Sequence, residues 1–506
     1  MPLPSTRDSG PAWPAAALLG TLAAVGPLFL LVTANADDGL TGAHAMLVAE
    51  GAVPYRDYFS PLWPGADLLY GGWFAVLGAS YATLRTLTTL GLLTGVAAAF
   101  ALGRQVLTAP WAGGLALLWG AWSAQFLGHG PYHLFGSAAA MGMAWALLRA
   151  RPAPRSWWWF AVAGVLAALA TLFRQSLGVV ALAGLVAAFL LGRGRSAAPM
   201  AAGGALVALT MLAWLAATGA LNPFIEQSFG FTTVSYLPSN FRGMPRFPAE
   251  LTGLWGAHRW TRELLETGIW TGGLLVPLAA LGVLLREPFR RARARLLPGP
   301  LVLAVMASAF LAAAIYRPDA PVLWSSVVPA LVLGAALLRR WPAFRRAGPW
   351  AVGALIVLAL APAAADWLRL AGVGPAPRPV TVEGAVGPAL IAQGQAAAIE
   401  RALEPRDGPV AFLPALKGLY VLSGRPPPIS FAILRHGYST PSQVRRAQGE
   451  LVRRGVRWIV YAPGLERFRG TDDPWTLPEF LEARYERVAT LGELPSGPLE
   501  LYRSRS

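Results

Sequence analysis

The sequence predicts an all-α membrane domain with about eleven transmembrane helices, followed by a small α/β domain outside the membrane. Of the 506 residues, 55% are hydrophobic and only 13% are charged, whereas soluble domains carry roughly 25% charged residues. Many apolar runs reach the ~20 residues that a helix needs to cross a bilayer. The composition changes from about residue 372 onward, where the tail holds 13 of the 26 acidic residues.

The charge balance and the lack of cysteine exclude several classes of function. Without cysteine there are no disulfides, no thiol catalysis and no thiolate metal sites. Of the 42 basic residues, 41 are arginine and one is Lys417. The arginines are scattered in small loop clusters without a continuous basic face, so the net charge of +16 does not indicate a nucleic-acid partner.

The first apolar run follows Arg7 and is predicted to be an uncleaved first span. It is too long for the core of a signal peptide, and no convincing small-residue cleavage site follows it. Together the predicted spans cover residues 12–32, 84–103, 109–127, 132–148, 157–173, 176–192, 199–219, 268–285, 299–316, 321–338 and 349–368.

Residues 64–79 decide the predicted topology. They are apolar but short, with Asp67 near their start, and such segments often lie in the interface. If they lie there, the loops on one side hold 16 arginines, and the longer loops on the other side hold 9 before the tail. If residues 64–79 crossed the membrane, every later loop would change sides. The arginine-rich loops would then lie outside, against the positive-inside rule. We therefore expect a bacterial-type cytoplasmic membrane, a cytoplasmic N-terminus, and an extracytoplasmic first loop, 34–83.

The same topology divides the chain into a membrane domain, 1–371, and an extracytoplasmic domain, 372–506. A second outer loop, 220–267, is long and rich in aromatic residues, which argues against disorder. In the tail, the pattern predicts strands at 408–414, 456–462, 485–491 and 498–503, and a helix at 441–454. All five histidines are expected on the outer side: His44, His129, His133, His258 and His436.

The first outer loop carries the strongest signal for chemistry. Asp37 and Asp38 follow the first span directly, and a short amphipathic helix is predicted from about Gly39 to Glu50. Acidic residues beside a membrane are costly, so such a pair is a functional candidate. Both acids could instead cap the helix that follows, because Asp is favoured at that position.

The order of motifs in this loop resembles that of the GT-C glycosyltransferases. Along the chain, the loop contains these features in order: an acidic pair, a short helix, a glycine, Pro-Tyr-Arg-Asp, Pro-Gly, a second short helix, and an arginine that opens the next span. They correspond to Asp37-Asp38-Gly39, Gly51, Pro54-Tyr55-Arg56-Asp57, Pro64-Gly65, Gly78 and Arg85. The match is best over about residues 34–90, and the general layout extends it to the whole chain. The branch that it resembles includes protein O-mannosyltransferases, aminoarabinose transferase and lipopolysaccharide-core glycosyltransferases.

The resemblance implies an inverting transfer from a polyprenyl-phosphate-linked sugar to a lipid, glycan or protein acceptor outside the cytoplasm. It implies that Asp37 is the base, with Asp38 at a position usually held by Glu or Asp. The residues agree with this, because a sugar hydroxyl is a poor nucleophile that a positioned carboxylate helps to deprotonate. Arginine suits the phosphate of the leaving group.

Several outer residues are candidates for substrate binding, and some of them have a plainer alternative. Arg56 and Asp57 could form only a surface ion pair, Arg174 could snorkel to the interface, and His129 with His133 could be an interfacial cluster. The candidates are Tyr55, Arg56, Asp57, Arg85, His129, His133, Arg174, His258 and Arg317.

Two departures from the family pattern stand out, and the metal question stays open. Many members carry a lysine before the Pro-Gly step, but residues 60–64 contain none. Many also have an acid in the second outer loop, where residues 128–133 contain two histidines instead. No cofactor is predicted, and no spacing typical of metal ligands occurs, although a divalent metal between acids and histidines is left open.

Two other classes of function compete with a glycosyltransferase. A lipid or glycan transporter, or a flippase, predicts charged residues in the middle of spans and helices broken by Gly or Pro. The sequence shows almost none, since Asp366 lies near the outer end of its span. A non-catalytic assembly protein would not need the acidic pair.

Overall fold

The fold is described from a computed structural model of the chain. Some predictions fall on residues that the structure does not describe: His258, Arg317, the span 268–285 and most of the loop 220–267. The structure describes residues 12–32, 34, 37–150, 157–192, 195–236, 298–315, 324, 326–339, 341–373, 377–435, 438–466 and 476–505.

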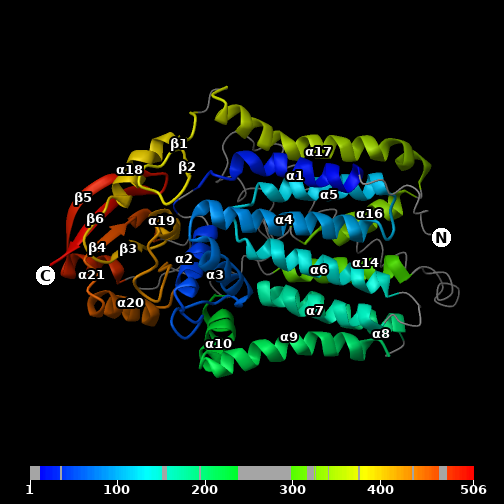
Figure 1. Ribbon diagram of the computed structural model, residues 1–506, viewed down its shortest axis with the longest axis horizontal. Coiled ribbons are helices and arrows are strands. Elements are labelled where there is room, and N and C mark those ends of the chain that lie inside the picture. Colours follow the sequence, from blue (N-terminus) through cyan, green and yellow to red (C-terminus); the bar gives the residue numbers. More distant parts are fainter. Residues whose placement is uncertain are drawn as a thin grey trace.

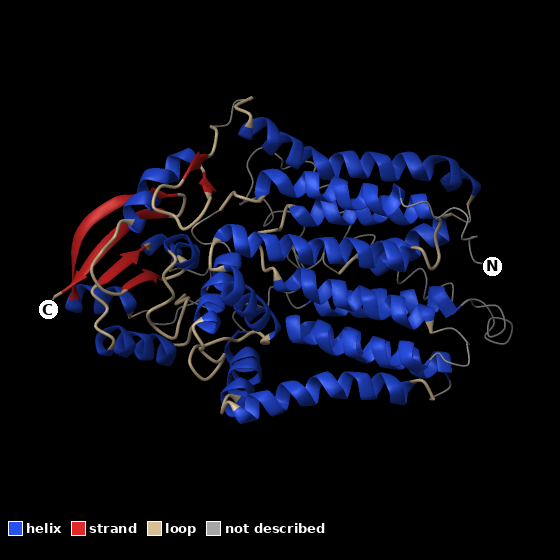
Figure 2. Cartoon of the chain, viewed as in Figure 1, coloured by secondary structure: helices blue, strands red, loops and turns tan. Residues whose placement is uncertain are grey.

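Long apolar helices lie side by side in a bundle, and all described strands lie beyond one end of it (Figures 1 and 2). Three of the described helices are long and apolar enough to cross a membrane: α4, α9 and α17. The count of eleven spans therefore stays a prediction. The bundle helices are α1 (Ala12–Val25), α4 (Tyr81–Gly103), α5 (Ala109–Ala124), α6 (Tyr132–Arg149), α7 (Trp157–Phe173), α8 (Gly178–Gly192), α9 (Ala197–Ala217), α14 (Pro298–Ile315), α16 (Val328–Leu338) and α17 (Pro342–Leu370).

Glycines let neighbouring bundle helices approach closely, as is common in membranes. A Cβ on Gly164 of α7 would lie 1.9 Å from the carbonyl oxygen of Met200 in α9. A Cβ on Gly95 of α4 would lie 2.5 Å from the ring of Trp119 in α5. Trp119 is fully buried in the core cluster of the bundle. Substitution at these glycines would push helices apart, so the small residues set the bundle's spacing.

Two short helices lie across the end of the bundle, between it and the strands (Figure 1). They are α2 (Asp37–Ala49) and α3 (Gly65–Leu77). At about 1.5 Å per residue, the 13 residues of α3 cover about 20 Å, which is less than the ~30 Å hydrocarbon core. The position of the segment 64–79 in the membrane interface stays a prediction. Helix α2 begins at Asp37, two residues earlier than predicted.

The connection between α2 and α3 is held from a distant segment. Tyr55 has φ of 70°, a strained value for a residue with a side chain, and its hydroxyl donates to the carbonyl oxygen of Leu62 at 2.6 Å. The side chain of Gln227 donates to the carbonyl oxygen of Tyr55 at 2.8 Å and accepts from the amide of Ser60 at 3.0 Å. Gln227 belongs to the π-helical segment η4 (Glu226–Tyr236), which follows α10 (Leu221–Ile225).

The C-terminal region contains a four-stranded sheet with the order β3-β4-β6-β5. The strands are β3 (Val410–Leu413), β4 (Trp458–Tyr461), β5 (Tyr485–Leu494) and β6 (Gly497–Ser504), at the four places where the sequence predicted strands. β3 and β4 pair in parallel, and the other pairs are antiparallel. Helix α20 (Pro441–Arg453) forms the crossover that a parallel pair needs, and a capping box of Thr440 and Gln443 begins it.

The other elements of this region were not predicted: β1 (Val380–Thr381), β2 (Leu390–Ile391), α18 (Gln393–Leu403), α19 (Lys417–Ser423) and α21 (Leu477–Arg484). Of these, α19 matters most, because it packs directly on α2. A Cβ on Gly39 would lie 2.6 Å from the backbone nitrogen of Gly418, and that nitrogen donates to the carbonyl oxygen of Ala34 at 2.9 Å. This close approach brings the first residue of α19, Lys417, to the first residue of α2, Asp37.

Candidate functional site

The two adjacent acids occupy opposite environments. Asp38 is fully buried and receives two contacts from Arg85, with Nε at 2.7 Å and Nη2 at 2.6 Å from the same oxygen, Oδ2. Arg85 is 3% exposed, and its Nη1 also donates to the carbonyl oxygen of Leu28 at 3.0 Å. Burial raises the pKa of the Asp38 carboxyl, and the charge of Arg85 opposes that rise. This ion pair joins α2 to α4.

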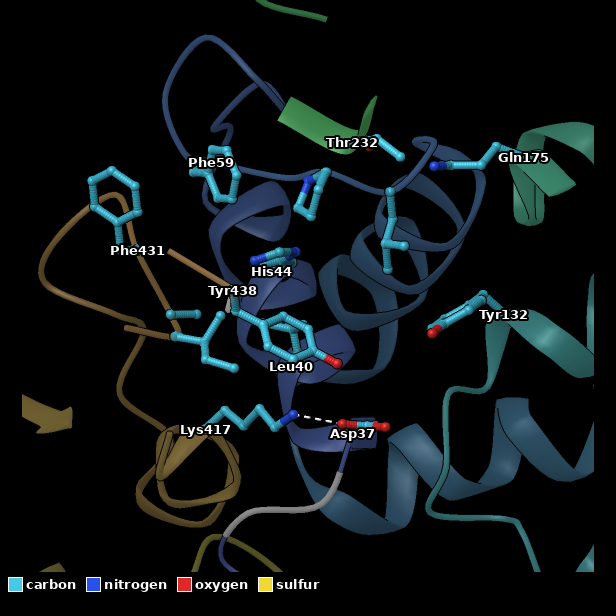
Figure 3. Close-up of a pocket in the computed structure, with 14 residues that line it drawn as sticks. Asp37, Leu40, His44, Phe59, Tyr132, Gln175, Thr232, Lys417, Phe431 and Tyr438 are labelled. Atoms are coloured by element: carbon cyan, nitrogen blue, oxygen red, sulfur yellow. Dashed lines mark hydrogen bonds and ion pairs between the residues drawn. The ribbon is translucent and has the colours of Figure 1, made fainter. Parts of the chain in front are cut away.

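Asp37 is accessible and forms an ion pair with the chain's only lysine. Its side chain is 41% exposed, and its Oδ1 lies 2.6 Å from Nζ of Lys417. The Lys417 side chain is only 6% exposed, because its stem passes through the contact between α19 and α2. Figure 3 shows the two side chains meeting at one end of a pocket.

The pocket lies between α2, the 59–62 loop and the C-terminal region, and most of its lining is apolar. Few polar groups converge on it, which is typical of ligand sites. The lining residues are Asp37, Leu40, His44, Phe59, Pro61, Leu62, Tyr132, Gln175, Thr232, Lys417, Phe431, Ala432, Ile433 and Tyr438 (Figure 3).

One face of α2 supplies three of these residues. Asp37, Leu40 and His44 are spaced at i, i+3 and i+7, which places them on the same side of a helix. His44 is 3% exposed, and its Nδ1 lies 3.3 Å from Oδ2 of Asp67 on α3. The hydroxyls of Tyr58 and Ser60 donate to that same Asp67 oxygen at 3.0 and 3.2 Å. A buried carboxylate thus holds the histidine ring in place.

The Pro-Tyr-Arg-Asp motif lies beside the pocket rather than in its lining. Arg56 contacts the carboxylate of Asp57 through Nε at 2.8 Å and Nη2 at 2.7 Å, and its Nη1 donates to the carbonyl oxygen of Thr218. Asp57 accepts a hydrogen bond from the amide of Val53 at 2.7 Å, and Arg56 holds the pKa of the Asp57 carboxyl below its usual value. Tyr55 is 3% exposed and packs against Phe224. These contacts support the turn that carries Phe59 and Ser60.

Arg174 and His133 are buried near the pocket and His129 is partly buried, but none of these three predicted ligands is among the pocket's lining residues. Arg174 is 3% exposed, and it donates to Oγ of Ser176 at 2.8 Å and to the carbonyl oxygen of Ala313 at 3.2 Å. His133 is the second residue of α6 and is 8% exposed, with its ring 4.3 Å from that of Tyr132. His129 lies in the preceding turn. Among the described residues, no group of three or more His, Cys, Asp or Glu side chains is arranged to hold a metal ion.

Sequence reasoning missed Lys417 and the pair of His44 and Asp67. Lys417 carried one signal, since it is the only lysine in a chain that uses arginine 41 times. For His44 the signal was its i+7 spacing from Asp37 on an amphipathic helix, and for Asp67 it was a carboxylate near the start of an apolar segment. Gln175 and Thr232 carried no signal, because they reach the pocket from two other parts of the chain.

Comparison with solved structures assigns the fold. The structure resembles ArnT from Cupriavidus metallidurans in the apo state, with a TM-score of 0.56, 12% identity and 97% of each chain covered. It also resembles ArnT bound to undecaprenyl phosphate, with a TM-score of 0.55, 13% identity and 98% of each chain covered. A third match is the oligosaccharyltransferase AglB from Archaeoglobus fulgidus in complex with an inhibitory peptide and a dolichol-phosphate, with a TM-score of 0.53 and 11% identity over 98% of this chain and 74% of that one.

No protein-family profile and no curated protein sequence matches the chain. At these identities the likeness concerns the fold, and it extends along the whole chain. ArnT and AglB are both GT-C membrane glycosyltransferases, the class that the motifs of the first loop resemble. The chain therefore has the fold of the GT-C membrane glycosyltransferases.

Proposed function

We propose that this protein is an inverting glycosyltransferase that moves a sugar from a polyprenyl-phosphate donor to an acceptor outside the cytoplasm, with Asp37 as general base. The observation that carries the proposal is the contrast within the acidic pair. Asp38 is buried against Arg85, whereas Asp37 faces a pocket with 41% of its side chain exposed. Of the two acids, Asp37 is the one whose carboxylate is exposed to an acceptor hydroxyl.

The proposed transfer is a single displacement. The acceptor oxygen attacks the anomeric carbon, the bond from that carbon to the phosphate oxygen breaks, and polyprenyl phosphate leaves. The acceptor proton passes to the carboxylate of Asp37, which acts as a general base. The fold supports this chemistry, because structures with the same fold bind undecaprenyl phosphate and dolichol-phosphate.

Lys417 is the cation that we assign to the donor phosphate. The sequence suggested Arg174, Arg56 and His133 for this role, but Arg56 is paired with Asp57, and Arg174 contacts Ser176 and the carbonyl oxygen of Ala313. Among the described lining residues, Lys417 is the one Lys or Arg side chain. An ammonium group beside the base could contact the leaving phosphate, a role for which lysine is well suited.

Replacing Lys417 should weaken the use of donor more than the use of acceptor. Loss of a charge-assisted contact costs about 1.5–3 kcal/mol, so Lys417→Met should raise the donor KM by roughly ten- to a hundredfold. The measurement is sugar transfer in proteoliposomes against the concentration of radiolabelled undecaprenyl-phosphate sugars, with a panel of sugars tested first.

A control for Lys417→Met is Arg453→Met, which removes an exposed cation from the last turn of α20. It should leave the donor KM unchanged, and Arg174→Ala should have a smaller effect than Lys417→Met. A Lys417→Met enzyme whose donor KM matches that of the wild type would refute the assignment.

The position of the C-terminus tests the proposed topology. Helices α2 and α3 and the C-terminal sheet lie at the same end of the bundle, and α1 runs toward that end (Figure 1). A green fluorescent protein that folds only in the cytoplasm, fused after Ser506, should be dark, whereas periplasmic alkaline phosphatase at the same point should be active. A fluorescent fusion would place the pocket on the cytoplasmic side and contradict the proposal.

The described helices do not favour a transporter. Arg85 is buried near the start of α4, and Asp366 with Arg369 lies near the end of α17. Charged residues of a transport pathway lie near the middle of spans. The polar groups that converge in this structure do so at the end of the bundle, where a transfer reaction would take place.

A further inference from the structure

The pocket continues beyond Asp37 and Lys417 to an end that the proposed transfer step does not use. There, His44 of α2, Phe59 of the first loop and Thr232 of η4 line the wall together with Gln175, as Figure 3 shows. His44 is seven residues after Asp37, which corresponds to about 10 Å along the helix axis. A group bound by His44 is therefore remote from the atoms that react at Asp37.

We propose that this end of the pocket, lined by His44, Phe59, Gln175 and Thr232, is an acceptor subsite that binds a neutral sugar. The inference rests on the proposed function and narrows its acceptor from lipid, glycan or protein to a glycan. Phe59 packs against the apolar C–H face of the sugar ring, and the three polar side chains bind its hydroxyls.

Two polar atoms of this subsite are unpaired in the described part of the chain. Oε1 of Gln175 and Oγ1 of Thr232 are buried and have no hydrogen-bond partner there. Leaving such a group buried and unpaired costs about 1–3 kcal/mol, so two of them in one pocket indicate a polar ligand. Sugar hydroxyls both donate and accept, and they therefore suit the carbonyl oxygen of an amide and the hydroxyl of a threonine.

His44 adds a directed hydrogen-bond acceptor. Asp67 lies 3.3 Å from its Nδ1, and a carboxylate beside Nδ1 favours the tautomer with the proton on that nitrogen. The other nitrogen, Nε2, makes no hydrogen bond to another described residue, and in this tautomer it accepts from a hydroxyl. Because Tyr58 and Ser60 also donate to Asp67, the carboxylate is fixed and the ring is oriented before a ligand arrives.

The aromatic wall is assembled from three distant segments. The ring of Phe59 lies 5.0 Å from that of Phe231 in η4 and 5.7 Å from that of Phe431 in the C-terminal region. Phe431 also lines the pocket. Held by these two aromatic neighbours, Phe59 presents an apolar surface beside the polar groups. A sugar ring has both an apolar C–H face and polar hydroxyls, so this combination suits it.

Charge argues for a neutral ligand rather than a phosphorylated one. A bound phosphate needs cations, and the described lining offers one Lys or Arg, namely Lys417, which lies at the other end beside Asp37 and is assigned to the donor phosphate. The other charged group at the far end is the carboxylate of Asp67, behind His44. An anionic acceptor group would thus meet a carboxylate without a compensating arginine or lysine.

Saturation-transfer NMR on the full-length protein in nanodiscs tests the subsite without turnover. The probes are a panel of neutral hexose, pentose and N-acetylhexosamine disaccharides, the same sugars as phosphate esters, and an unglycosylated Ser/Thr peptide. At least one neutral disaccharide should bind and the phosphate esters and peptide should not. Failure of the whole neutral panel, or preference for a phosphate ester or the peptide, would overturn the proposal.

Matched variants assign that binding to the pocket. Thr232→Val removes one hydroxyl at nearly constant shape and should weaken the disaccharide about three- to tenfold, as expected for one hydrogen bond. Thr210→Val, at an exposed position of α9, should have no effect. His44→Ala should weaken binding to a similar degree, and His44→Gln, which keeps an acceptor oxygen, should recover part of it. Equal affinities for wild type and Thr232→Val would refute the assignment.

Asp37→Asn separates this inference from the proposed function. The variant should keep disaccharide binding and lose transfer. Suppose that disaccharide binding depends on Thr232 but Asp37→Asn transfers sugar at an undiminished rate. This result would reject Asp37 as the base and would still support the sugar subsite. Loss of transfer in Asp37→Asn without any binding of neutral sugars would reject the subsite alone.

Discussion

Asp37→Asn should abolish most of the sugar transfer while leaving the protein folded and able to bind its donor. Asparagine has the shape of aspartate and still accepts a hydrogen bond from Lys417, but it cannot take the acceptor proton. General-base catalysis typically contributes roughly 10²–10⁴-fold, and we expect a fall in kcat of that size. The measurement is release of undecaprenyl phosphate from a radiolabelled donor in proteoliposomes.

A control for this prediction is Asp57→Asn, since Asp57 lies in the same loop but is paired with Arg56 and does not line the pocket. Its kcat should stay within a few-fold of that of the wild type. If Asp37→Asn turns over at a near-native rate, Asp37 is only the first residue of a helix bound to Lys417, and the base is elsewhere.

Arg85→Met should strongly destabilise the fold. The substitution leaves the carboxylate of Asp38 buried without its partner, and breaking a buried ion pair in this way costs about 3–5 kcal/mol. Methionine fills much of the same volume, so the loss reflects charge rather than a cavity. The measurement is thermal unfolding in detergent, compared between wild type and variant at equal protein and lipid content.

The double variant Asp38→Asn/Arg85→Met identifies the cause. Neutralising Asp38 removes the uncompensated charge, so the double variant should unfold at a higher temperature than Arg85→Met alone. The sequence suggested instead that Arg85 binds substrate. An Arg85→Met protein of native stability with a raised donor KM would favour that role over the ion pair.

Periodicity and composition predicted much of the fold, because both reflect local structure. The four strands of the C-terminal sheet and α20 lie where alternating and helical patterns predicted them. The short helices α2 and α3 were visible as segments too short or too polar to span a membrane. Helix α19 lacked such a signal, because a helix of 7 residues completes too few turns to show a period.

The contacts of the site could not be predicted in the same way, since they join residues distant in sequence. The pair of Lys417 and Asp37 bridges 380 positions, and it depends on the close approach of Gly39 and Gly418. Asp38 and Arg85 are 47 positions apart, and nothing in the sequence tells which of two adjacent acids faces inward. Helix geometry decides it: consecutive residues point about 100° apart, so when Asp37 faces the pocket Asp38 faces α4.

The most direct test of the account is a cryo-electron microscopy structure of the protein in nanodiscs with undecaprenyl phosphate. We predict that the phosphate lies in the pocket, in contact with Nζ of Lys417 and beside the carboxylate of Asp37, with the far end near His44 still open. A phosphate bound away from this pocket, for example at Arg345 and Arg346 near the start of α17, would contradict the assignment of the donor site and the role of Asp37 with it.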